Sequence, residues 1–164
     1  MTTNALVKEL EDFMVSRVIP SEAAIHHELS VAKNRWTYPP TMRALRAEAK
    51  ARGLWLFPLP ERLGGKGLSL TEYAPLAERM NWSNVGPDIF NCYSGTISNA
   101  TILDQAASTE LKDRYLSRLL AGDSRSCISI TEREVPSSDP TDLKFAVIRD
   151  GDTYVCLLYT SRCV

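Results

Sequence analysis

The side chains that most often carry metal or redox chemistry are few in this sequence and poorly spaced for it. The cysteines are Cys92, Cys127, Cys156 and Cys163. They contain no C-x-x-C pair, and no histidine lies at metal-ligand spacing from them. His26 and His27 are adjacent, so on a helix they point about 100° apart and supply too few ligands for a metal. The pattern predicts free thiols in a reducing compartment and two surface histidines.

A glycine-rich stretch at 61–68 has the composition of a phosphate-binding loop. It reads Glu-Arg-Leu-Gly-Gly-Lys-Gly-Leu. It lacks the G-x-x-x-x-G-K-[ST] spacing, and no strand of normal length leads into it. A structural turn is the better interpretation.

The remaining candidate chemistry lies at 126–139. Residues 126–131 are short, apolar and β-branched, which favours a strand, and Thr131-Glu132 stands at its end. Ser137-Ser138-Asp139 follows a few residues later. Taken by residue type alone, a threonine and a glutamate at this place mark no more than the end of a strand.

Helices are predicted for most of the chain before this segment. Apolar residues at helical spacing predict a helix over 4–18, which we expect Pro20 to end. A second helix is expected over 21–33, and a third from Pro40 or Thr41 to Arg52, with Gly53 just past its end.

The later helices carry recognisable start and stop signals. Ser69-Leu70-Thr71-Glu72 is a capping box for a helix to about Trp82, kinked or started late by Pro75. A buried helix is expected over 96–107. Ser108 begins the last one and Gly122 stops it. Its predicted inward face is Leu111, Tyr115, Leu116, Leu119 and Leu120.

The character of the sequence changes after Gly122. Residues 143–148 alternate in a strand pattern, Arg149-Asp150-Gly151-Asp152 signals a tight turn, and 153–155 is the return strand. Helices followed by strands predict an α+β chain, with a helical bundle leading into a β domain.

Composition excludes several classes of protein. The 164 residues are 44% apolar and 24% charged with net charge −1, which is typical of a globular protein rather than a disordered one. The balance of charge gives no basic surface for nucleic acid. No apolar run approaches the roughly 18 residues needed to span a bilayer.

Four motifs in order resemble the acyl-CoA dehydrogenase family. Residues 53–78 resemble its "PE-x-x-GG-x-G" loop and the following "AE-x" helix, and 105–123 resemble its "E-E-Q-K-x-x-[WY]-L-x-x-L" helix. Residues 128–139, Ile-Ser-Ile-Thr-Glu-Arg-Glu-Val-Pro-Ser-Ser-Asp, resemble the flavin motif "[FY]-C-[MV]-T-E-P-x-x-x-S-[SD]", and 149–155 match the next hairpin. The Ser-Ser-Asp form is most similar to the long-chain-type branch.

The resemblance implies a domain order and a cofactor. Residues 1–123 would form the family's N-terminal helical domain, and 124–155 would begin its middle β-barrel domain, truncated here. FAD would be the cofactor. Ile130 and Thr131 would donate to the flavin edge where reduction places negative charge, and Ile128 and Ser129 would pack and bond along the flavin. Ser137 and Ser138 would complete the cofactor contacts, with Ser138 also touching the CoA part of the substrate.

Two features of the chain depart from the family. Arg133 stands where the family has proline, and Pro136 replaces a small residue, so the loop backbone should differ. The glutamate that removes the substrate's α-proton belongs to a C-terminal helical domain in family members, and nothing here corresponds to it. We therefore nominate no catalytic residue, and Glu132 is assigned to the flavin motif rather than to that role.

The last nine residues, 156–164, resemble a translated transposon mosaic end, of the kind used to fragment DNA for sequencing. The bases TGT CTC TTA TAC ACA TCT encode Cys-Leu-Leu-Tyr-Thr-Ser, and the inverted copy AGA TGT GTA TAA encodes Arg-Cys-Val and a stop. We expect a non-native tail. The alternative is a divergent strand, since Val-Cys-Leu-Leu-Tyr has good β-propensity.

The sequence leaves three functions to compare. The first is α,β-dehydrogenation of an acyl-CoA thioester by an FAD enzyme of fatty acid β-oxidation, with electrons passing to an electron-transfer flavoprotein. The full-length enzyme would form a homo-oligomer and lie in the cytoplasm, or in mitochondria or peroxisomes of a eukaryote, and this truncated chain would be inactive. The second is an acyl-CoA oxidase or related flavin oxidase. The third, a non-enzymatic helical interaction domain, is the weakest.

Overall fold

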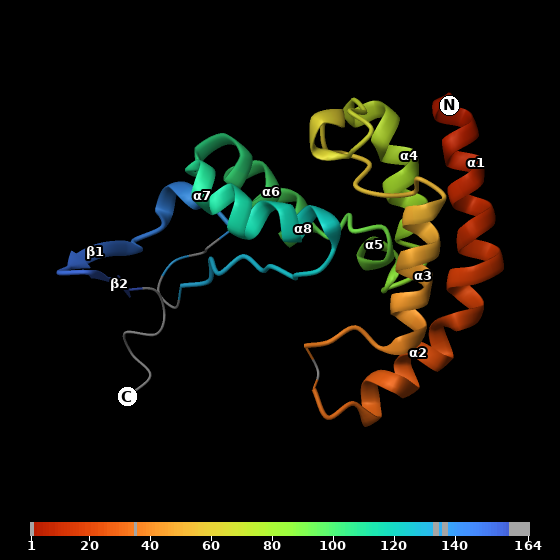
Figure 1. The fold of residues 1–164 in the computed structure, drawn as a ribbon, viewed down its shortest axis with the longest axis horizontal. Coiled ribbons are helices and arrows are strands. Elements are labelled where there is room, and N and C mark those ends of the chain that lie inside the picture. The colour runs from red at the N-terminus through yellow and green to blue at the C-terminus, as the bar shows by residue number, and fades with distance from the viewer. Residues whose placement is uncertain (1, 35, 133–134, 136–137, 158–164) are drawn as a thin grey trace. The chain divides into compact units, whose positions relative to one another are not determined.

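The chain folds into two compact units, Met1–Cys127 and Ile128–Val164. The computed structural model describes residues 2–34, 36–132, 135 and 138–157. In the described part of the first unit the regular elements are helices, and the second carries an antiparallel pair of strands (Figure 1). The predicted α+β class is confirmed.

The first unit begins with one continuous helical segment over 3–31. It consists of α1 (Thr3–Phe13), a π-helical turn (Met14–Val18) and α2 (Ile19–Val31), and the Thr2 hydroxyl caps its start. The prediction that Pro20 ends the first helix is wrong. The π turn, in which the Ile19 N–H donates to the Met14 carbonyl, lies directly before Pro20. Its wider winding accommodates a proline ring that would break a regular helix.

The next two helices begin and end close to where the sequence predicts. Helix α3 (Pro40–Ala51) starts with proline in its first turn, and Gly53 follows it at φ +71°. The glycine-rich stretch forms a short 3₁₀ turn, Glu61–Leu63, that ends at Gly64 in the left-handed region. Helix α4 (Leu70–Met80) carries the predicted capping box, although Pro75 lies inside it.

The last helices of this unit follow a short α5 (Gly86–Ile89). Helix α6 is Ser94–Ala106, and a continuous helix over 109–121 contains α7 (Thr109–Leu111), a π turn (Lys112–Leu116) and α8 (Ser117–Ala121). Leu116 and Leu119 face inward as predicted, whereas Leu111 and Tyr115 are 42% and 48% exposed. The π turn changes the helical register between them, so one stripe cannot stay buried along the whole helix.

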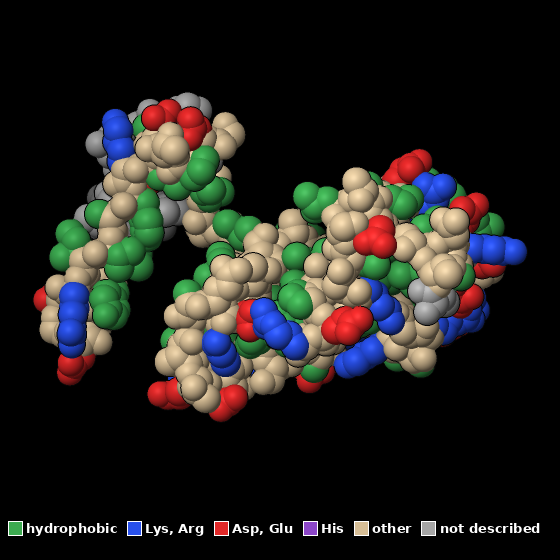
Figure 2. All heavy atoms as spheres, turned by 90° about the horizontal axis from the view of Figure 1, so that it is seen from above, with side chains coloured by type: hydrophobic (Ala, Val, Ile, Leu, Met, Phe, Trp, Pro, Cys, Tyr) green, Lys and Arg blue, Asp and Glu red, His purple; other side chains and the backbone are tan. Residues whose placement is uncertain are grey.

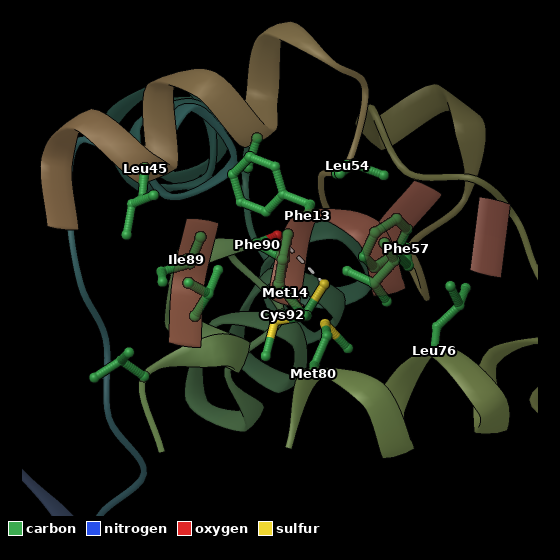
Figure 3. Packing of buried hydrophobic residues seen from close by; sticks show 14 of the residues in the cluster. Phe13, Met14, Leu45, Leu54, Phe57, Leu76, Met80, Ile89, Phe90 and Cys92 are labelled. Atoms are coloured by element: carbon green, nitrogen blue, oxygen red, sulfur yellow. Dashed lines mark hydrogen bonds between the residues drawn. The ribbon is translucent and has the colours of Figure 1, made fainter. Parts of the chain in front are cut away.

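Two clusters of apolar side chains hold the first unit together. In the larger one, Phe90 contacts Phe13 edge-on with ring centroids 5.7 Å apart, and the Cys92 thiol donates to the Phe90 carbonyl (Figure 3). The smaller cluster joins Trp55, Leu56 and Leu59 to α6 and α8. Every described helix is too short or too polar to cross a membrane.

The second unit contains a β-hairpin. Strand β1 (Ala146–Asp150) pairs antiparallel with β2 (Thr153–Leu157), and Asp150 faces Thr153 across the two-residue turn. Gly151 adopts φ +59°, as the predicted tight turn requires. The first strand starts at Ala146 rather than Leu143. The side chains at 146–150 and 153–156 are exposed, and hydrophobic ones reach the surface of this unit (Figure 2).

Candidate functional site

The segment that carries the predicted flavin motif has no regular secondary structure at 126–131. The predicted strand is therefore wrong for the described chain. A strand forms only beside a partner that accepts and donates its ladder hydrogen bonds, and the described strands pair with each other. Residues 126–131 thus have a strand-forming composition but no neighbouring strand within the described part of the chain.

The backbone donors of this segment are not engaged by the described part of the chain. Ile128, Ser129, Ile130 and Thr131 are exposed, and within the described residues none of their N–H groups donates to a protein acceptor. The Thr131 hydroxyl is likewise unengaged there. Three consecutive amides and a hydroxyl at 129–131 are thus free to bind an electron-rich group. Donors of this kind can stabilise a group on which negative charge develops.

Two carboxylates organise the residues after the donors. Glu132 Oε2 accepts a hydrogen bond from the Lys144 N–H at 3.0 Å, which joins the motif to the chain that enters the hairpin. Asp139 Oδ1 accepts from the Thr141 N–H at 2.9 Å and the Thr141 hydroxyl at 2.6 Å. The side-chain bond from Thr141 is the main cause that lowers the pKa of Asp139. Ser138, directly before this turn, is exposed.

Part of the predicted site lies outside the described residues. Ser137 falls there, and so do Arg133 and Pro136, where the sequence departs from the family. The structure therefore describes five of the six residues predicted to contact flavin, four at 128–131 and one at Ser138.

The first unit fixes the chain that leads to this segment by capping the end of α8. The carbonyls at the end of that helix and just after it lack part of their intrahelical hydrogen bonding, and side chains from elsewhere in the unit donate to four of them. Asn91 donates to the Leu119 carbonyl at 3.0 Å, Trp55 Nε1 to Leu120 at 3.0 Å, Lys50 to Ala121 at 2.9 Å and Arg46 to Gly122 at 3.3 Å. The direction in which the chain leaves α8 is thus held by donors from α3 and from the loops around Trp55 and Asn91.

Arg46 is the centre of this capping arrangement. Its side chain is only 5% exposed, and it donates to the Asp88 carbonyl, to Asn91 Oδ1 and to the Gly122 carbonyl. Its guanidinium also lies 4.2 Å from the centroid of the Tyr38 ring. Burial lowers the pKa of Arg46, and burial followed by the Asp88 carboxylate raises the pKa of Tyr38 to about 12. A buried cation is tolerated here because carbonyls and rings replace its water.

The chain is held again just before the motif begins. Ser126 donates to the Gly95 carbonyl at 3.0 Å, and Asn99 donates to the Cys127 carbonyl at 3.1 Å. A Cβ at Gly95 would lie 2.8 Å from the Ser126 carbonyl oxygen, so only glycine permits this approach. Helix α6 therefore fixes the backbone as far as Cys127.

Sequence reasoning missed the residues that do this positioning. Arg46 looks like an ordinary exposed arginine of an amphipathic helix, and Asn91 like a loop residue. One signal was present, because Arg46 falls among Met42, Leu45 and Ala49, the core-facing positions of α3. A charged residue on a core stripe needs a partner, but the sequence does not say where that partner stands.

Comparison with known proteins identifies the family of this chain. Residues 2–123 match the family model described as "Acyl-CoA dehydrogenase, N-terminal domain". The chain belongs to the acyl-CoA dehydrogenase family. It is 36% identical to acyl-CoA dehydrogenase family member 10 of Mus musculus, over 92% of this chain and 14% of that protein. It is 35% identical to family member 11 of Gallus gallus, over 90% of this chain and 19% of that protein.

A solved structure agrees with this assignment. A Mycobacterium abscessus protein that carries a provisional acyl-CoA dehydrogenase name matches with a TM-score of 0.79 and 38% identity. The match covers 94% of this chain and 40% of that one. The chain thus spans less than half the length of each of these relatives. The α-helical part of the chain is the N-terminal domain of that family.

Proposed function

We propose that this chain supplies the N-terminal helical domain and one side of the flavin site for FAD-dependent α,β-dehydrogenation of an acyl-CoA thioester. The observation that carries the proposal is the row of free amide donors and the Thr131 hydroxyl at 129–131, within the sequence that resembles the flavin motif. Bound FAD would accept the hydride from the substrate's β-carbon. The proposed electron acceptor is an electron-transfer flavoprotein.

The role of each residue follows from its chemistry. The amides of Ile130 and Thr131, with the Thr131 hydroxyl, would donate to the pyrimidine edge of the flavin. Donors that are fixed before the reaction stabilise developing charge without reorganisation. Ile128 would pack along the ring. Ser138 would hydrogen bond to the cofactor and to the CoA portion of the substrate.

The remaining parts of the machinery are assigned to sequence outside this chain. The family's α-proton base belongs to its C-terminal helical domain, and we place it there. The chain by itself is accordingly expected to be inactive. The same proposal implies that the full-length enzyme is a homo-oligomer. It also implies a location in the cytoplasm, or in mitochondria or peroxisomes of a eukaryote, where acyl-CoA thioesters are oxidised.

A chimera tests the proposal without requiring the chain to act alone. Residues 1–155 would replace the matching part of the Mycobacterium abscessus relative, and flavin content and anaerobic flavin bleaching by acyl-CoA would be measured. We expect bound flavin and bleaching. Thr131→Val should slow bleaching by about 100-fold, the usual cost of one lost donor to a developing charge.

A threonine far from the motif provides the control for this chimera. Thr109 is exposed at the start of α7, and Thr109→Val removes the same hydroxyl at a position that resembles no cofactor contact. It should bleach like the parent. Equal rates for Thr131→Val and Thr109→Val would refute the assigned role of Thr131, and a folded chimera without flavin would refute the proposed function.

A further inference from the structure

The first unit contains a cavity of about 880 Å³ lined by cations and aromatic rings. This size lies within the range of small-molecule sites, roughly 300–1,000 Å³. The loop before α3, the outer face of that helix and the chain after α8 form its walls. All of these lie within Met1–Cys127.

One face of α3 gives the cavity its charge. Arg43, Ala47 and Lys50 line it, and their spacing of four and three residues places them on one side of the helix. Arg46 and Arg125 add two further cations, whereas Asp123 is the acidic residue in the lining. Arg125 is paired with Asp88 at 3.1 Å. After these pairings the wall retains an excess of positive charge.

The cations keep donors that the protein does not use. Lys50 gives one of its three N–H groups to the Ala121 carbonyl, and Arg125 uses part of its five for Asp88. Arg43 is exposed, and its side chain makes no hydrogen bond or ion pair within the described residues. Arginine and lysine in this number on one wall suit a phosphate group, which accepts several charge-assisted hydrogen bonds at once.

Two aromatic rings in the lining are free to stack. Tyr38 and Trp55 are already covered by the guanidinium of Arg46, at 4.2 and 5.0 Å from the ring centroids. Trp36 and Tyr93, by contrast, are 84% and 44% exposed. Stacking of a base on an aromatic ring favours binding and tolerates any base. An exposed tryptophan at the mouth of a cationic cavity is therefore a platform for a flat heterocycle.

We propose that this cavity binds a nucleotide, with its diphosphate against Arg43 and Lys50 and its base against Trp36. The simplest ligand of this kind is a nucleoside diphosphate. The helical unit would then bind a nucleotide at a site of its own. It goes beyond the flavin function and does not depend on it.

Calorimetric titration of the 1–164 chain with ADP, inorganic pyrophosphate and adenosine tests the site. We expect ADP to bind more tightly than either part. Arg43→Gln should weaken ADP and pyrophosphate binding by about tenfold, the loss of one charge-assisted bond. Trp36→Ala should weaken ADP by about tenfold but leave pyrophosphate unchanged. Both residues are exposed, so far-UV circular dichroism should stay the same.

Two control variants remove equivalent side chains elsewhere in the first unit. Arg114 is an exposed arginine outside the cavity lining, and Trp82 is 44% exposed. Arg114→Gln and Trp82→Ala should bind ADP like the parent chain. The proposal is overturned if millimolar ADP gives no saturable heat, or if Arg43→Gln weakens binding no more than Arg114→Gln does. Flavin content of the chimera is a separate measurement, so either idea can fail alone.

Discussion

Replacing Gly122 by alanine should destabilise the first unit well beyond the ordinary cost of a lost glycine. Gly122 adopts φ +83° at the end of α8. An added Cβ would lie 2.6 Å from Arg46 Nη2 and 2.8 Å from Trp55 Cζ2. Neither neighbour can move freely, because the guanidinium donates to the Asp88 carbonyl and to Asn91, and the indole donates to the Leu120 carbonyl.

The expected magnitude has two parts. An alanine in the left-handed region costs about 1 kcal/mol after the gain from a stiffer unfolded chain. Forcing a methyl group into a filled site adds about 1–3 kcal/mol. The free energy of unfolding should therefore fall by about 3 kcal/mol, and Tm by about 3–6 °C for each kcal/mol in a unit of this size.

Gly64 provides a matched control for this substitution. Its φ is +82°, nearly the same as that of Gly122, but a Cβ built on it meets nothing within 4 Å. Gly64→Ala should therefore cost only the backbone part, about 1 kcal/mol. The difference between the two variants isolates the crowding against Arg46 and Trp55.

Urea unfolding followed by far-UV circular dichroism and tryptophan fluorescence measures both variants. Equal losses of stability in Gly122→Ala and Gly64→Ala would refute the reasoning, because they would show that the cap yields to a methyl group at little cost.

Three further predictions concern single side chains of the first unit. Arg46→Met should lower the free energy of unfolding by about 3 kcal/mol, since it leaves carbonyls and Asn91 without their donor. Arg43→Met, on the exposed face of the same helix, should change it by less than about 0.5 kcal/mol, and equal urea midpoints would contradict this assignment. The hydrogen bonds from Ser69 lower the pKa of Glu72 from its ordinary value of 4.5. The ionised carboxylate therefore stabilises the fold above pH 4.5, and this stabilisation is lost as the pH falls through the pKa of Glu72 in the folded chain. The stability gap between the parent and Glu72→Gln should thus narrow in acid, and a gap that widens below pH 4.5 would be the wrong sign. Burial raises the pKa of Cys92 to about 12, so iodoacetamide at pH 8 should label exposed Cys127 and spare Cys92 until urea is added, as peptide mass spectrometry would show. Labelling of Cys92 as fast as Cys127 in the native chain would show that the core around it is open.

Local signals predicted the helix boundaries well where a specific side chain makes the boundary. The Ser69 capping box, the Ser108 cap and the Gly122 stop are confirmed, because each depends on residues within one turn of the chain. Pro20 misled the prediction for the same reason. Its effect depends on the winding of the preceding turn, and a π turn before it is not encoded by any one residue.

In the candidate site too, the sequence predicted some features, and others depend on segments far apart in the chain. Resemblance predicted a flavin motif at 128–139 from residue types and order alone, and that assignment stays a prediction. Within the described residues the donors at 129–131 have no strand partner, since the two described strands pair with each other. Pairing is a property of two segments rather than one. The sequence predicted a strand there from β-branched residues, and composition cannot supply the missing neighbour.

The sequence by itself determined the family, the order of helices before strands, and the caps and turns that depend on adjacent residues. Only the tertiary structure decided that Arg46 is buried and that Asn91, Trp55 and Lys50 meet it at the end of α8. Those side chains come from segments up to 76 positions from the carbonyls they bind. Periodicity and capping are short-range and can be read along the chain, whereas the need of a helix end for donors is met by whichever side chains the packing brings near.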